Sequence, residues 1–294
     1  MHPRSISCIL GEYMNRLITI VKSDGTREIF AEEKLRHSLT RVGATPEVIE
    51  EIVETIVSEI RDGMTTHEIY SRAFSLLKKD SSPIAIKYSI RRALFELGPD
   101  GFPFEKFVAR IFRMWGYETL TDQMVMGQCV PHEMDVVAWK GDTLAMIEAK
   151  FHNAFGLKSD LKVALYIKAR FDDLSGILYD YGAKERKLEE RWLITNTKFS
   201  EQAIHYGVCQ KIQLVGWNYP DHNNLHQIIE QNGLHPITAI TSLSAESKRE
   251  LIGQDILVCI DLVDQQDVLT KIGIKGVEAE KIIAEARTII EKAK

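Results

Sequence analysis

The chain has 294 residues, of which 45% are hydrophobic and 27% are charged, the ordinary balance of a soluble globular protein. This length predicts two or three domains, because a single core rarely grows beyond about 250–300 residues. No apolar run approaches the roughly 18 residues that a membrane helix needs, which excludes a helical membrane protein. The formal net charge is −5, so a protein that coats nucleic acid non-specifically is also excluded.

The cysteines and the first residues indicate the cellular setting. Four cysteines lie far apart without a CxxC pair, which argues against a zinc ribbon and a disulfide framework; they are Cys8, Cys129, Cys209 and Cys259. We therefore expect a reducing, cytoplasmic location. The start of the chain lacks the basic and apolar regions of a secretory signal. A recognisable pattern begins only after Met14, so we expect residues 1–13 to lie outside the fold, as a loose tail or the product of a misplaced start codon.

The first segment predicts a β-hairpin followed by a helical bundle. Residues 17–30 form the expected hairpin, because Asp24-Gly25 lies between two runs of alternating apolar residues. Helical periodicity follows, and the expected helices cover 31–41, 46–61, a segment that begins at Thr65 or Thr66, and 83–98. Gly98-Pro99-Asp100-Gly101 is a strong breaker, so we place the first domain boundary there and assign residues 17–98 to one domain.

The middle segment, residues 101–223, mixes helical and strand patterns. The expected helices cover 104–115, 159–174 and a segment opened by Ser200, and the expected strands cover 117–121, 134–139, 144–151, 191–197 and 212–217. This order predicts an α/β domain around a small central sheet. From about Leu225 the pattern is helical, so residues 224–294 are a predicted C-terminal helical module. The fold class is therefore α/β with several domains.

Two carboxylates and a lysine lie on neighbouring expected strands of this domain. Glu148 and Lys150 share one face of a strand because side chains alternate, and Asp135 on the preceding strand can point to the same side. Carboxylates suit Mg²⁺ or Mn²⁺, and Glu105 is a third candidate ligand. Such a metal activates water and neutralises charge on a phosphate, while Lys150 would position the water or stabilise the transition state. The alternative is a solvated strand edge with a Glu–Lys pair.

Charged residues on the following helix have two interpretations. Lys162, Lys168 and Arg170 are candidate phosphate contacts, and they equally suit a solvated charged face. His132 and His152 flank the carboxylates, but single histidines are more often structural.

Four segments together resemble the restriction-endonuclease-like PD-(D/E)xK nucleases of the Mrr-like branch: FPFEKFVARIFRMWGYE, HEMDVVAW, AMIEAKFH and WLITNTKFSEQAIHYG. The resemblance implies a restriction-endonuclease-like α/β/α fold and Mg²⁺-dependent hydrolysis of DNA phosphodiesters. It places Glu105, Asp135, Glu148 and Lys150 at the catalytic positions, the three carboxylates also being the metal ligands.

The N-terminal hairpin has the features of an anion site. Its turn bears Lys22 and Gly25, which present an ammonium and backbone N–H groups to phosphates, and Lys34 lies in the first turn of the next helix. ITIVKSDGTREIFAEEKL and PIAIKYSIRRAL resemble the ATP cone, a regulatory nucleotide-binding module. The resemblance implies ATP or dATP as a regulatory ligand and adds an aromatic and basic cluster, Tyr88, Arg91 and Arg92. No GxxxxGK(S/T) loop is present, so we expect ATP to be bound and not hydrolysed.

The C-terminal run LTKIGIKGVEAEKIIAEARTII, residues 269–290, resembles a helix-hairpin-helix element, which grips DNA phosphates. The pattern is degenerate, and a small structural or dimerisation module fits it equally well. Together these features predict an ATP-regulated, Mg²⁺-dependent DNA endonuclease with DNA and ATP or dATP as partners. We expect a homodimer or higher homo-oligomer, because cutting two strands is easiest with paired active sites. The alternative is a nucleotide-sensing, DNA-binding regulator with an inactive nuclease fold.

Overall fold

The computed structural model describes residues 18–22, 25–41, 44–80, 90–98, 101–153 and 157–291. The expectation for residues 1–13, the start of the helix expected at 83–98, and Tyr88 lie outside these residues. Within them, no helix is both long enough and apolar enough to cross a bilayer.

The N-terminal unit is a hairpin that packs on helices, as predicted. Strand β1 (Thr19–Val21) pairs antiparallel with β2 (Arg27–Ile29), and helices α1 (Glu32–Arg41), α2 (Pro46–Glu59) and α3 (Thr66–Asp80) follow. Residues 90–95 are also helical. The core of this unit is aliphatic and includes Leu39, Ile52, Ile56, Ala73 and Leu77.

Local capping explains where its helices begin. The Thr45 hydroxyl accepts a hydrogen bond from the backbone N–H of Val48, and Pro46 occupies the first helical position. Before α3, Thr65 and Glu68 cap each other: the Glu68 N–H donates to Thr65 Oγ1 at 3.1 Å, and the Thr65 N–H donates to Glu68 Oε2 at 2.8 Å.

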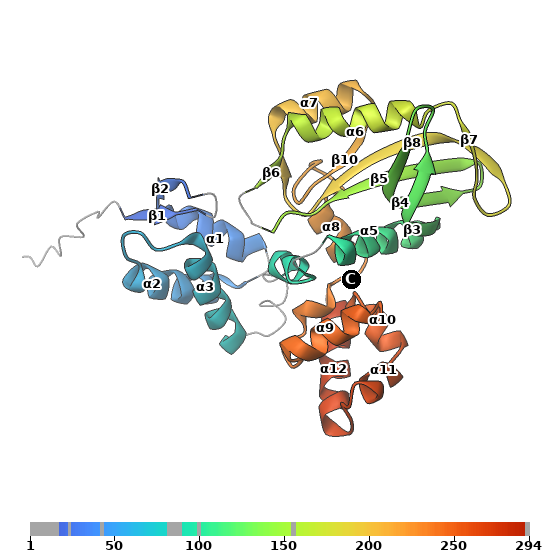
Figure 1. The fold of residues 1–294 in the computed structure, drawn as a ribbon. Coiled ribbons are helices and arrows are strands. Elements are labelled where there is room, and N and C mark those ends of the chain that lie inside the picture. Colours follow the sequence, from blue (N-terminus) through green and yellow to red (C-terminus); the bar gives the residue numbers. More distant parts are fainter. Residues whose placement is uncertain are drawn as a thin grey trace, which may run out of the picture.

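The central unit is a mixed sheet with helices on both faces (Figure 1). Its elements in chain order are α5 (Phe102–Met114), β3 (Glu118–Met126), β4 (Pro131–Lys140), β5 (Thr143–Lys150), β6 (Lys158–Ser159), α6 (Leu161–Asp173), β7 (Leu178–Asp180), β8 (Glu185–Thr195), β9 (Lys198–Phe199), α7 (Glu201–Cys209) and β10 (Gln213–Val215). The strand order is β10-β8-β5-β4-β3, and β7 pairs with β8. Strands β3, β4 and β5 are antiparallel, whereas β5, β8 and β10 run parallel.

Alternating side chains divide the two faces of this sheet between two cores. Val136 and Ala138 of β4 pack on the side of α5, and Val137 and Trp139 pack on the side of α6. Helices α6 and α7 cover one face, and α5 with α8 (Leu225–Gln231) covers the other (Figure 1). The expected α/β domain is confirmed at this level.

Several strands differ from the prediction in length. The strand expected at 117–121 continues to Met126, and the strand expected at 191–197 begins at Glu185. The extension of β8 carries polar side chains on its exposed positions, Glu185, Lys187 and Glu189, which weakens the apolar signal. Strand β3 ends the sheet among the described residues, and a terminal strand needs only one apolar face. The short strands β6, β7 and β9 were not predicted.

The C-terminal helices form a core of their own. They comprise the short 3-10 helix η1 (Ile237–Ala239), α9 (Ala245–Gly253), α10 (Cys259–Asp264), α11 (Asp267–Lys271) and α12 (Val277–Glu291). Helix α8 buries Leu225, Ile228 and Ile229 in the core beside α5, so the separate C-terminal core begins after it, although the predicted module began at residue 224. The turn between α11 and α12 contains Gly273 and Gly276 with φ of +85° and +59°, conformations that favour glycine.

Candidate active site at the end of the sheet

The pairing of β4 with β5 brings Asp135 to Glu148 and Lys150. Val136 lies opposite Ile147 in the antiparallel ladder. Beyond this pair, the Asp135 carboxylate accepts a hydrogen bond from the backbone N–H of Ala149 at 2.6 Å. Asp135 is therefore tied to the residue between Glu148 and Lys150.

Glu148 makes an ion pair that connects β5 to α6. Its Oε2 lies 2.5 Å from Nη1 of Arg170, and the two side chains are 13% and 10% exposed. Arg170 lies on the buried face of α6, three residues after Ile167 and one before Phe171. The interpretation of Arg170 as a phosphate contact or solvated residue was therefore wrong. Its helical spacing from Ile167 was the signal that could have placed it inside.

Burial dominates the electrostatics of this site. It raises the pKa of both Asp135 and Glu148, because desolvation penalises the charged form, and the charge of Glu148 raises the pKa of Asp135 further. The Ala149 N–H lowers the pKa of Asp135, while Arg170 and Lys150 lower that of Glu148. The two carboxylates, Asp135 and Glu148, are thus both in surroundings that oppose ionisation. A cation bound beside them would favour their ionised forms.

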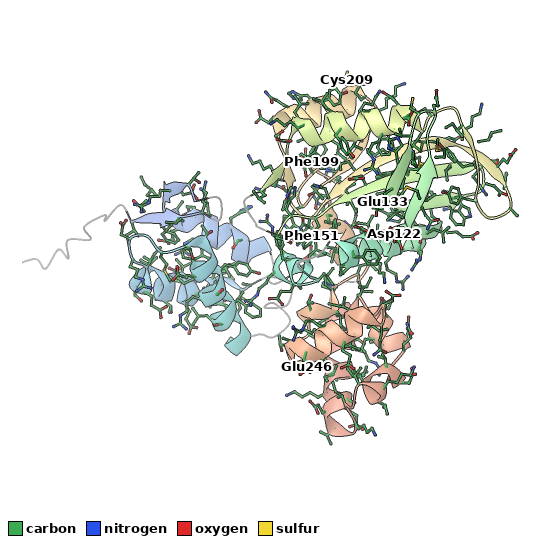
Figure 2. The ribbon with its side chains drawn as sticks, in the orientation of Figure 1. Asp122, Glu133, Phe151, Phe199, Cys209 and Glu246 are labelled. Atoms are coloured by element: carbon green, nitrogen blue, oxygen red, sulfur yellow. The ribbon has the colours of Figure 1, made fainter. Side chains whose placement is uncertain are left out.

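Glu105 contributes to the same acidic region from α5. Burial is the main cause that raises its pKa, followed by the charges of Asp122, Glu133 and Glu148. Figure 2 labels Asp122 and Glu133 among the side chains of the central unit. Asp122 and Glu133 were not predicted as part of the site, and their only sequence signal is their position on the strands beside Asp135. The predicted convergence of acidic residues is therefore larger than the sequence indicated.

Carboxylate oxygens are the donors that Mg²⁺ and Mn²⁺ prefer, so the chemistry of Asp135 and Glu148 fits such a cation. Their raised pKa values also fit, because a cation would restore the ionised form of each. Among the described residues, no group of three or more His, Cys, Asp or Glu side chains is arranged to hold a metal ion. The role of Glu105 as a third ligand therefore stays a prediction. Lys150 is exposed at the end of β5.

His132 belongs to a clamp beside this site. Its Nε2 lies 2.8 Å from Asp173 at the end of α6, and the same carboxylate accepts hydrogen bonds from the backbone N–H groups of Cys129 and Val130. Hydrogen bonds from Cys129 and His132 lower the pKa of Asp173 to about 2. A Cβ at Gly127 would overlap the carboxylate. The clamp therefore fixes the β3–β4 connection to α6.

The N-terminal hairpin brings its predicted lysines together. Lys22 and Lys34 lie 2.7 and 3.0 Å from Oε2 of Glu28, and these hydrogen bonds are the main cause that lowers the pKa of Glu28. Gly25 lies in the adjoining turn with φ of +80°, and a Cβ there would meet no atom within 4 Å. The three predicted residues thus share one exposed surface.

Arg91 and Arg92 face the rest of the chain. The Arg91 guanidinium lies 5.6 Å from the Trp217 ring centre, and burial lowers its pKa to about 10. Arg92 pairs with Glu96 at 2.6 Å and lines a cavity of about 850 Å³ together with basic residues of α9. Between them, the Ala93 carbonyl accepts a hydrogen bond from Thr238 Oγ1 at 2.5 Å. These contacts connect the helix at 90–95 to both other units.

Comparison with known proteins identifies two of the three regions. Residues 18–95 match the ATP cone domain, and residues 235–290 match the family described as AF1548-like, C-terminal. An uncharacterized protein of Archaeoglobus fulgidus is 38% identical over 184 residues, which cover 62% of this chain and 99% of that protein. A crystal structure described as a protein of unknown function, AF1548, superposes with a TM-score of 0.54 at 37% identity and covers 65% of this chain and 99% of its own. The ATP cone prediction is confirmed, whereas none of these descriptions names an activity for the central sheet.

Proposed function

The chain belongs to the AF1548-like family and carries an ATP cone, and we propose that it is a DNA endonuclease regulated by ATP or dATP. The observation that carries the proposal is the pair of buried carboxylates, Asp135 and Glu148, beside the exposed Lys150 at the end of β5. The layered α/β unit and the resemblance to PD-(D/E)xK nucleases support it.

Asp135 and Glu148 would hold Mg²⁺ or Mn²⁺, with Glu105 as the third carboxylate. When bound, the ion supplies an acidified water and neutralises charge on the phosphate. The hydrogen bond from Ala149 keeps the Asp135 carboxylate in place, and Arg170 orients that of Glu148. Lys150 would donate to the phosphate or to the attacking water, because it is exposed and its charge acts on Glu148.

The ATP cone supplies a regulatory ligand. A ligand shifts an equilibrium only through its different affinities for two states, so nucleotide binding must change the contacts of the cone with the rest of the chain. The stacking of Arg91 on Trp217 and the hydrogen bond between Ala93 and Thr238 are the contacts through which it would do so. We expect ATP or dATP to change assembly or cleavage by roughly 5- to 150-fold, the range of typical allosteric couplings.

A plasmid-nicking assay tests the proposal directly. We expect nicking by the full chain to require Mg²⁺ or Mn²⁺, to respond to ATP, and to fall by at least about 100-fold in Asp135→Ala and Lys150→Ala. Lys187→Ala is a matched control, because Lys187 is an exposed lysine on β8 away from the carboxylates. Thermal melts verify that each variant folds.

Two results would contradict the proposal. Absence of metal-dependent nicking by the wild type, with DNA binding retained, would favour the nucleotide-sensing regulator. Nicking by Asp135→Ala at the wild-type rate would show that the chemistry lies elsewhere.

A further inference from the structure

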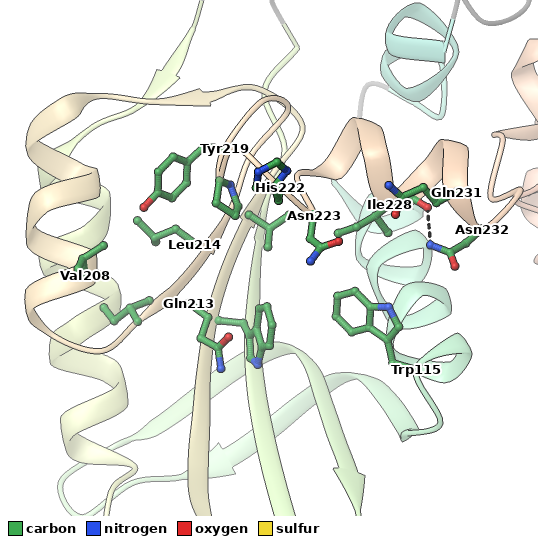
Figure 3. Close-up of a pocket in the computed structure, with 14 residues that line it drawn as sticks. Trp115, Val208, Gln213, Leu214, Tyr219, His222, Asn223, Ile228, Gln231 and Asn232 are labelled. Carbon is green, nitrogen blue, oxygen red and sulfur yellow. Dashed lines mark hydrogen bonds between the residues drawn. The ribbon is translucent and has the colours of Figure 1, made fainter. Parts of the chain in front are cut away.

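A pocket of about 630 Å³ lies at the edge of the terminal strand β10, between α7 on one face of the sheet and α5 with α8 on the other (Figure 3). Its walls come from β8, β10, α7, α8, the end of α5 and the loop after β10. The residues that line it are Trp115, Trp192, Val208, Ile212, Gln213, Leu214, Val215, Tyr219, Pro220, His222, Asn223, Ile228, Gln231 and Asn232.

The pocket runs along the edge of β10. Four consecutive residues, 212–215, line it, although successive side chains of a strand point to opposite faces. A pocket lined by all four residues must therefore run along the edge of the strand. Because β10 ends the strand order in the described sheet, its outer edge offers backbone N–H and C=O groups to a ligand.

Two indoles form one wall of the pocket. The rings of Trp115 and Trp192 lie 5.8 Å apart with an interplanar angle of 39°, and Phe112 packs edge-on against both. The Trp192 Nε1–H donates to Glu190 at 3.0 Å, which fixes the ring. This wall is therefore already in place before a ligand arrives, which reduces the entropy lost on binding.

The polar side chains of the pocket are four amides together with Tyr219 and His222. Gln213, Asn223, Gln231 and Asn232 surround the space, and each amide offers both donors and an acceptor. Asn232 donates to the Ile228 carbonyl at 2.8 Å, which orients it (Figure 3). Of the fourteen described lining residues, none is Asp, Glu, Lys or Arg. An ionised ligand would have no opposite charge here, so the chemistry favours an uncharged, planar ring with hydrogen-bonding edges.

We propose that this pocket binds a nucleobase, supplied either by a free nucleoside or by a nucleic-acid strand. Aromatic side chains stack on bases whatever their identity, and amides and strand-edge groups match the donors and acceptors of base edges. The pocket volume accommodates a nucleobase. The loop at 219–223 and α8 border the strand edge (Figure 3), which leaves less room for an extended peptide to pair with β10. The site is distinct from the proposed nuclease centre, because Glu105, Asp135, Glu148 and Lys150 are not among the residues that line it.

Calorimetric titration of the full chain with adenosine, guanosine, cytidine and thymidine tests the proposal, with deoxyribose as the ligand that lacks a base. We expect at least one nucleoside to bind and deoxyribose not to bind. Gln231→Ala should weaken nucleoside binding roughly 2- to 12-fold, the loss of one hydrogen bond. Gln202→Ala, an exposed glutamine on α7 outside the pocket, should leave binding unchanged. If the nucleoside binds the ATP cone instead, Gln231→Ala will leave its affinity unchanged. That result would overturn the assignment.

Single-stranded oligonucleotides with and without one abasic position distinguish the two sources of the base. If the wild type binds the abasic strand more weakly than the intact strand, and Gln231→Ala removes this difference, the source of the base is a strand. Binding of nucleosides with no such difference identifies a free nucleoside. If no nucleoside binds and the two strands bind equally to wild type and Gln231→Ala, the proposal is wrong.

Discussion

Two of the places where charged side chains converge, the N-terminal hairpin and the end of the central sheet, differ in exposure. On the N-terminal hairpin, Lys22 and Lys34 meet Glu28 on an open surface. At the end of the central sheet, Asp135, Glu148 and Arg170 meet inside, with the Glu148 and Arg170 side chains only 13% and 10% exposed.

The difference reverses the direction of the pKa shifts. Opposite charges lower the pKa of Glu28, because water still solvates the ionised form. Burial raises the pKa of Glu148 even though Arg170 lies beside it. Charge complementarity therefore dominates on the hairpin, whereas desolvation dominates in the sheet. In the sheet, the ionised carboxylates are penalised by burial, and a bound cation or a substrate would offset this penalty. On the hairpin no such penalty dominates.

The largest effect is expected when the buried pair is broken. Arg170→Met should lower the free energy of unfolding by about 3–5 kcal/mol, because Glu148 would remain buried without its partner. Lys168→Met is the matched control from the same helix, since Lys168 pairs with the exposed Asp172 and such pairs contribute about 0–1 kcal/mol. Urea unfolding measures both. Equal losses in the two variants would contradict the contrast between buried and exposed pairs.

A smaller effect, of opposite sign, is expected at Asp135. Its folded pKa lies above the unfolded value of 3.8, so the folded state binds the proton more tightly. The stability that this proton contributes is fully present below pH 3.8 and is lost as the pH rises through the raised pKa. At pH 7, Asp135→Asn should therefore stabilise the metal-free protein, by about 1 kcal/mol, while it abolishes cleavage.

Unfolding measured across pH supplies the check on Asp135. The variant should lose the decline of stability with rising pH that the wild type shows above pH 3.8. Asp264→Asn, at an exposed aspartate of α10, should leave the profile as it is. If Asp135→Asn is less stable than the wild type and keeps the same dependence of stability on pH, burial does not raise the pKa of this carboxylate.

The smallest change in stability is expected on the hairpin, where the readout is nucleotide affinity. Lys22→Ala should alter stability by less than about 1 kcal/mol, because its pair is exposed, yet weaken ATP binding about tenfold through the loss of a charged contact. Glu28→Gln should strengthen binding, because it releases both lysines from a competing carboxylate. Arg27→Ala, another exposed basic residue of the hairpin, is the control. Calorimetry that detects no ATP binding by the wild type would contradict the assignment of this surface.

Local features of this chain could be predicted from the sequence. Asp24-Gly25 indicated the first hairpin, and Ser200 indicated the start of α7. The proximity of Asp135 to Glu148 also followed, because the two residues lie on neighbouring expected strands. Each of these depends on interactions between residues a few positions apart or within one hairpin.

Burial and distant partners depended on the tertiary structure. Arg170 was assigned to solvent or phosphate, yet packing of α6 on the sheet places it against Glu148, 22 residues earlier. Arg91 was assigned to the nucleotide, yet it lies against Trp217. The indole pair of Trp115 and Trp192 forms only when the end of α5 packs beside β8. The sequence by itself determined most of the helices and the approximate positions of the longer strands, because backbone propensity and periodicity are local. The tertiary structure decided which charges are desolvated and which rings form a pocket, because both depend on what covers them.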